Sequence, residues 1–169
     1  GGARMDVRVR ETNLGNAVAD ALLDYGQSDF THKSNLAVTN GGGLRETIAK
    51  DKPITKGDII AVLPFGNSVA QIQVTGQNIY DMFVKSLGSI LQVNESGKNV
   101  FDENGQPLLE PSGGFLQVAG ARVYYDTTLP TEKRILSIDI LDPETGVYKP
   151  LNTTETYYLV TNDFLACWW

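Results

Sequence analysis

The residues with the clearest capacity for chemistry lie in one glycine-rich stretch, residues 40–45, in which Asn40 and Arg45 flank three glycines and a leucine. The Asn40 amide can donate and accept hydrogen bonds, and the planar Arg45 guanidinium suits phosphate or carboxylate. Because glycine lacks a Cβ, three in succession favour a tight turn that reaches positive φ and leaves its N–H groups open. On these residues alone the stretch is either a ligand-contacting loop or a plain turn after the apolar run 36–39.

Side chains that commonly carry catalysis are scarce. The chain has one histidine, His32, and one cysteine, Cys167, so it cannot build a histidine-rich metal centre or a zinc ribbon. A serine triad would need His32, which we expect in a solvated loop, and no Gly-x-Ser-x-Gly elbow, Walker loop or Gly-x-Gly-x-x-Gly fingerprint occurs. The residues alone therefore favour a binding domain with no catalytic residue and no metal ligands of its own.

Composition narrows the possible partners. The 169 residues fit one domain with a substantial core, since 41% are hydrophobic and 20% are charged. A net charge of -6 argues against nonspecific binding to nucleic acid or to an anionic membrane, and no segment has the length of a membrane span. One cysteine excludes an internal disulfide framework. Gly1 and Gly2 resemble the remnant of an affinity tag.

Periodicity predicts the elements that must position these residues. We expect an amphipathic helix over 14–25, with Asn13 as N-cap and Gly26 as stop, and a short helix capped by Thr55. A strand over 70–74 and a second amphipathic helix over 79–87 follow, then a polar excursion or small hairpin over 94–113. Further strands are expected at 115–118, 122–125, 134–141 and 157–161. Helices early and strands late favour an α+β domain.

Five stretches in order resemble the C-terminal domain of the 5'-nucleotidase family. They are RVRETNLGN (8–16), NGGGLR (40–45), LPFGN (63–67), GFLQV (114–118) and NDFLA (162–166). The resemblance spans nearly the whole chain and implies an α+β fold in which helices pack on a mixed sheet. It implies that residues 8–169 form the substrate-specificity domain, with residues 1–7 as a tag remnant or linker and the domain start.

The resemblance also implies a division of labour. In that family an N-terminal metallophosphoesterase domain, absent from this chain, holds two divalent metal ions and hydrolyses the phosphoester. The C-terminal domain binds the nucleoside or nucleotide, so this chain is expected to be catalytically inactive alone, without a cofactor of its own. The family further implies an extracytoplasmic location, in the periplasm, in the cell wall or secreted.

Site residues follow position by position from the resemblance. Phosphate and ribose contacts are implied for three residues, with Arg4 matching a second arginine found in some members, and two glycines would permit close approach of the substrate. Phe65 and Phe164 would hold the base between their faces, although apolar patterning alone makes either a candidate core residue, and Asn67 would bond the base edge. The contacting residues are Arg8, Asn40 and Arg45, and the glycines are Gly42 and Gly43.

The chain departs from the family pattern at its end. Members usually continue after the NDFLA segment into Gly-Gly-Asp-Gly, whose aspartate binds the ribose hydroxyls, whereas this chain has Cys167, Trp168 and Trp169. The tryptophans could fill the gap, form a dimer contact or reflect truncation. The substrate could be a nucleoside monophosphate, a dinucleotide, a nucleotide sugar or a cyclic nucleotide, and a non-catalytic adhesion module is the alternative from another class. The preferred base, the number of phosphates and the oligomeric state stay open.

Overall fold

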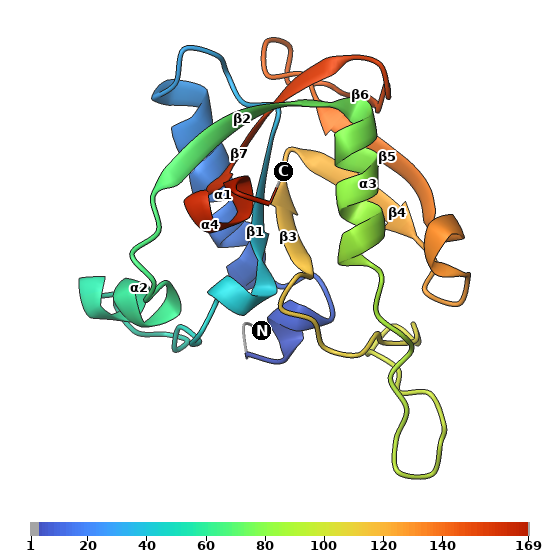
Figure 1. Cartoon of the computed structure of the whole chain (residues 1–169). Coiled ribbons are helices and arrows are strands. Elements are labelled where there is room, and N and C mark those ends of the chain that lie inside the picture. The colour runs from blue at the N-terminus through green and yellow to red at the C-terminus, as the bar shows by residue number, and fades with distance from the viewer. Residues whose placement is uncertain (1–3, 169) are drawn as a thin grey trace.

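The computed structural model describes residues 4–168. Its centre is a four-stranded mixed sheet with the strand order β2-β7-β1-β3 (Figure 1). β1 is parallel to β7 and antiparallel to β3, and β2 is antiparallel to β7. Together with its helices, this sheet confirms the expected α+β class. The strands are β1 (Leu36–Asn40), β2 (Val69–Thr75), β3 (Leu116–Ala119) and β7 (Thr156–Asn162).

A second sheet is antiparallel, with the order β4-β5-β6. β3 passes into β4 through Gly120, whose φ of 72° is a left-handed conformation that favours glycine. A Cβ there would also lie 2.2 Å from the Asn35 carbonyl oxygen. Gly120 therefore forms the corner at which the chain leaves one sheet for the other. The strands are β4 (Ala121–Tyr125), β5 (Ile135–Leu141) and β6 (Tyr148–Pro150), of which β6 was not expected from the sequence.

Two helices cover opposite faces of the central sheet, α1 (Asn13–Ser28) and α3 (Gly76–Ser86) (Figure 1). Successive residues of a strand point to opposite faces, so Ala37 joins the core under α1 while Leu36 and Val38 join the core under α3. All five residues of β1 are buried. The apolar stripe predicted for the second helix is confirmed, since its residues Ile79, Met82, Phe83 and Leu87 are each at most 3% exposed.

Both expected termini of α1 are corrected by the structure. The N-cap is Thr12, whose hydroxyl accepts a hydrogen bond from the Gly15 amide at 3.0 Å. Gly26 does not end the helix but lies within it. A Cβ on Gly26 would lie 2.5 Å from Ser34 Oγ and 2.7 Å from Val160 Cγ1, so this glycine allows α1 to pack closely on the sheet.

The N-caps of the other helices either match the prediction from the sequence or were not predicted. Thr55 caps α2 (Lys56–Val62) as predicted, and the structure adds a reciprocal capping box between Thr55 and Asp58. Thr75 forms the same arrangement with Asn78 at the start of α3. An unexpected short helix, α4 (Asp163–Ala166), is capped by Asn162, whose side chain accepts from the Leu165 amide at 2.8 Å. Short 3-10 turns complete the order: η1 (Asp6–Arg8), η2 (Gly41–Gly43) and η3 (Thr131–Lys133).

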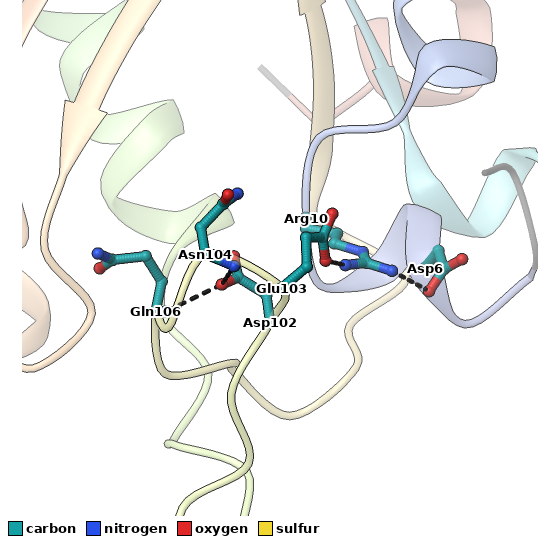
Figure 2. A network of polar contacts seen from close by, with 6 residues as sticks. All are labelled: Asp6, Arg10, Asp102, Glu103, Asn104 and Gln106. Atoms are coloured by element: carbon teal, nitrogen blue, oxygen red, sulfur yellow. Dashed lines mark hydrogen bonds and ion pairs between the residues drawn. The ribbon is translucent and has the colours of Figure 1, made fainter.

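The polar excursion over 94–113 is confirmed as a region of turns with isolated β-bridges. Its second turn, at residues 102–105, contacts the N-terminal segment through Glu103, which pairs with Arg10 (Figure 2). Arg10 also pairs with Asp6 at 3.1 Å. The Asp102 carboxylate accepts hydrogen bonds from the backbone amides of Asn104 and Gln106 and so stabilises the turn. Within residues 4–168, none of the helices has both the length and the apolar content that crossing a bilayer requires.

Candidate functional site

One edge of the central sheet brings the expected site residues together. Because β1 and β7 are parallel, their last residues, Asn40 and Asn162, lie at the same edge, and the two side-chain amides meet at 3.4 Å. β2 and β3 are antiparallel to these strands, so the segments that precede them, 63–68 and 112–115, reach this edge as well. Four loops distant in sequence therefore converge on one place.

A cleft of about 1150 Å³ opens at this edge. Eight residues expected to contact the substrate all line it, and they come from η1, the glycine turn, the segment after α2, and α4. These residues are Arg8, Asn40, Gly42, Gly43, Arg45, Phe65, Asn67 and Phe164.

The glycine turn differs from its expected conformation. None of Gly41–Gly43 has positive φ, because the three residues form the 3-10 turn η2. The Gly41 amide donates to the Phe115 carbonyl at 2.7 Å, and the Gly42 amide donates to the Gly113 carbonyl at 3.0 Å. A Cβ on Gly41 would lie 2.1 Å from the Val7 carbonyl oxygen. The first two glycines thus allow other parts of the chain to approach, and their amides are already bonded.

Asn40 is held by its neighbours rather than projecting freely. It is 9% exposed, and its Nδ2 donates to the Gly113 carbonyl at 3.3 Å while its Oδ1 accepts from Asn162 at 3.4 Å. Both bonds are long for amide hydrogen bonds. These contacts hold the side chain at the cleft wall, where it lines the cavity.

Positive charge gathers at one end of the cleft. Burial lowers the pKa of the Arg8 guanidinium, and the positive charges of Arg4 and Arg45 lower it further. The Arg8 Nε atom is buried and has no hydrogen-bond partner within residues 4–168. An anion placed here would relieve the repulsion among the three guanidinium groups and could satisfy the unpaired donor. This end of the cleft is suited to phosphate or carboxylate.

Two exposed aromatic rings also line the cleft, and one of them lies beside Arg45. Phe65 and Phe164 are 57% and 52% exposed, so neither is the core residue that apolar patterning allowed. The Arg45 guanidinium carbon lies 5.5 Å from the Phe65 ring centroid, within the range of a cation–π contact. The Phe164 ring lies 6.0 Å from that of Trp168, which also lines the cleft. Trp169 lies outside the described residues.

With this geometry established, comparison with known proteins decides the family. A family model described as "5'-nucleotidase, C-terminal domain" matches residues 1–167. The chain belongs to this family. Membership agrees with the resemblance of the five sequence stretches and with the fold.

Individual relatives extend beyond the C-terminal domain. The trifunctional nucleotide phosphoesterase protein YfkN of Bacillus subtilis is 34% identical over 98% of this chain, which covers 10% of that protein. Human 5'-nucleotidase is 28% identical over 98% of the chain, which covers 27% of the human protein. The crystal structure of a 5'-nucleotidase precursor from Thermus thermophilus superimposes with a TM-score of 0.76 at 33% identity, over 98% of this chain and 28% of that one. The chain thus spans well under a third of these relatives.

Several residues lining the cleft were not identified from the sequence. The polar face of α3 contributes Asp81 and Lys85, and the segments near it contribute Ser89 and Thr131. Lys85 Nζ lies 5.8 Å from the Trp168 ring centroid. The i,i+4 spacing of Asp81 and Lys85 is the available signal, but the family motifs do not cover this helix, and its apolar periodicity indicates only the buried face.

Metal chemistry has no evident location in the described part of the chain. Residues 4–168 contain no group of three or more histidine, cysteine, aspartate or glutamate side chains that could hold a metal ion. His32 is exposed, as expected, and stacks on Tyr158 with ring centroids 4.2 Å apart. The cleft combines cationic, amide and aromatic groups, a set that can bind an anionic ligand with a flat ring.

Proposed function

We propose that this domain binds the nucleotide part of a phosphoester substrate for a 5'-nucleotidase-type hydrolase. In the proposed full-length protein, an N-terminal metallophosphoesterase domain with two divalent metal ions performs hydrolysis, and this domain alone is inactive. The observation that supports the proposal is the convergence of Arg8, Arg45, Phe65 and Phe164 on one cleft. Cationic and aromatic groups in one cavity match the phosphate and the base of a single ligand.

Each group has a proposed role. The exposed rings of Phe65 and Phe164 would stack on the two faces of the base, which accommodates purines and pyrimidines alike because every base has a π-face. Asn67 would bond the base edge. Arg8 and Arg45 would bind phosphate or ribose oxygens through charge-assisted hydrogen bonds. Asn40 would contact the ribose, while Gly42 and Gly43 leave space beside it.

A substrate with a second polar group is the alternative within the same family. The cleft of about 1150 Å³ exceeds the usual range of small-molecule sites, roughly 300–1,000 Å³. It also continues along the polar face of α3 at Asp81 and Lys85. These features favour a dinucleotide or a nucleotide sugar as the second candidate substrate.

We also propose that the full-length protein acts outside the cytoplasm. The similar Thermus thermophilus protein is described as a precursor, which agrees with a processed, exported enzyme.

Calorimetric titration without metal tests the binding function. Adenosine, AMP and UDP-glucose should bind at millimolar or lower concentrations, whereas inorganic phosphate should not, because it lacks a base. Phe65→Ala should weaken adenosine and AMP binding by roughly 1–3 kcal/mol, and Arg45→Ala should weaken AMP binding more than adenosine binding. Phe101→Ala and Arg122→Ala remove the same groups outside the cleft and serve as controls. Unchanged adenosine affinity in Phe65→Ala would contradict the base contact.

A further inference from the structure

A second cavity of about 300 Å³ lies at the corner where β3 turns into β4. Ser86 and Leu116 line both this cavity and the nucleotide cleft, so they form a wall between the two. We therefore call the second cavity the rear cavity. The Leu116 amide donates to Ser86 Oγ at 2.9 Å, so the wall between the two cavities is a hydrogen-bonded contact between β3 and α3. Nothing in the proposed nucleotide site uses the rear cavity.

The inner wall of the rear cavity is apolar and firmly packed. It is formed by Phe83 and Leu87 beside α3 and by Phe115 and Leu116 beside β3. These four side chains are between 3% and 8% exposed and belong to the hydrophobic core. A ligand here would place its apolar body against fixed side chains, so the cavity requires no rearrangement to accept it.

The rim of the rear cavity carries negative charge and aromatic faces. Glu11 lies on the rim and accepts a hydrogen bond from Asn16 Nδ2 at 2.7 Å. No ion pair neutralises its carboxylate in the part of the chain that the structure describes. Tyr124 and Tyr125, also on the rim, are 52% and 37% exposed. Burial raises the pKa of the Tyr125 phenol, and the carboxylates of Glu11 and Asp102 raise it further.

Two arginines lie near the rim, and each is held by another group, although Arg122 keeps its positive charge. Arg122 also lines the cavity, but its guanidinium carbon lies 3.9 Å from the Tyr148 ring centroid, a close cation–π contact. Arg10, on the neighbouring N-terminal segment, is paired with Asp6 and Glu103 (Figure 2). Among residues 4–168 Glu11 therefore supplies a carboxylate without an ion-pair partner, and two tyrosines line the same cavity.

We propose that the rear cavity binds a small organic ammonium ion. The apolar body of the ligand would pack on Phe83 and Phe115, and its ammonium group would pair with Glu11 beside the tyrosine faces, which attract cations. A volume of about 300 Å³ is at the lower end of small-molecule sites and suits one ring with a short aminoalkyl chain. The rear cavity would bind a cation, whereas the proposed nucleotide cleft would bind an anion. The two sites would therefore have separate ligands.

Backbone amide NMR of the 169-residue chain tests this proposal directly. The probe is 2-phenylethylamine at about pH 7, where its amine is protonated, and the matched neutral probe is 2-phenylethanol. The amine should cause saturable shifts at the amides of Val118, Val123 and Tyr124, and it should bind about fivefold more tightly than the alcohol, as an ion pair of about 1 kcal/mol predicts. Equal affinity of the two probes, or no saturable shift at these amides, would overturn the proposal.

A variant pair tests the role of Glu11. Glu11→Gln keeps an oxygen that can accept from Asn16 but removes the charge, so amine affinity should fall about fivefold, to that of the alcohol, while alcohol affinity should not change. Glu132→Gln removes an exposed carboxylate away from the cavity and should affect neither. Equal amine affinity in Glu11→Gln and the unchanged chain would refute the pairing. AMP titration of the same samples reports on Asn40 and Arg45, so failure of the nucleotide proposal is observed separately.

Discussion

Replacing Gln117 with methionine should weaken both the fold and the placement of the cationic end of the cleft. Gln117 is on β3 and 1% exposed. Its Oε1 accepts from the Thr12 amide at 3.1 Å, and its Nε2 donates to the carbonyls of Val7 at 3.1 Å and Arg10 at 2.8 Å. One side chain thus connects the sheet to the N-terminal segment that carries Arg8.

The expected magnitude follows from the three bonds. Methionine has a similar volume but cannot replace these bonds, so two buried backbone groups and the partly buried Arg10 carbonyl lose their partners. At about 1 kcal/mol each, the free energy of unfolding should fall by about 3 kcal/mol. For a urea slope of about 2 kcal/mol/M, the midpoint should fall by about 1.5 M. Because Val7 directly precedes Arg8, a loosened η1 should also weaken AMP binding more than adenosine binding.

Urea denaturation followed by nucleotide titration measures both effects. Gln73→Met is the matched control, because Gln73 is exposed on β2 and the change removes the same amide without emptying a buried site. If the free energy of unfolding of Gln117→Met falls within about 1 kcal/mol of that of Gln73→Met, the three-bond argument is wrong. If AMP and adenosine lose affinity equally, Gln117 supports the fold without positioning Arg8.

Two further predictions concern α3 and the rear cavity. Thr75→Ala removes the capping box with Asn78 and should lower the free energy of unfolding by about 1 kcal/mol; a urea midpoint no lower than that of the exposed-site control Thr47→Ala would contradict this. Burial and the nearby carboxylates raise the pKa of the Tyr125 phenol, so above about pH 10 the unfolded chain releases this proton first and stability should fall with rising pH. Absorbance titration should show one late-ionising tyrosine whose pKa falls in Glu11→Gln, and an unchanged pKa would rule out that carboxylate as a cause.

The sequence predicted elements whose signals are local. The helix after Thr55, the strand before Gly76 and the following helix each have a cap or a regular apolar period, and the structure confirms them. Elements that depend on their neighbours were missed. β6 has three residues and α4 has four, too few for periodicity to indicate, and each forms because adjoining strands position it.

The errors at α1 and at the glycine turn have tertiary causes. Thr12 and Asn13 are both suitable N-caps. Thr12 is the N-cap in the structure because its amide donates a hydrogen bond to Gln117, 105 residues away, which fixes the residue before the helix. A Cβ on Gly15 would lie 2.0 Å from Gln117 Oε1, so this glycine also serves a distant contact. Gly41 similarly makes room for the Val7 carbonyl. Such close approaches cannot be read from neighbouring residues in a sequence.

The candidate site was predicted by motif order, and the strand topology explains why the motifs meet. No local pattern indicated that β1 is parallel to β7, yet this pairing places residues 40 and 162 at one edge. The face of α3 with Asp81 and Lys85 lies outside the motifs and was missed for that reason. The motifs thus identify part of the cleft lining, and the structure is needed to identify the rest.

The parallel pairing of β1 with β7 also sets an order of events during synthesis. A ribosome releases β1 early, but β7, which lies between β2 and β1, emerges more than a hundred residues later. Until then β2 has no partner strand in the central sheet, and its apolar side chains must remain exposed in the nascent chain. Contacts so distant in sequence slow folding and prolong exposure to aggregation. The segment that completes the sheet also carries Phe164, so the domain acquires its fold and its aromatic cleft in the same late step.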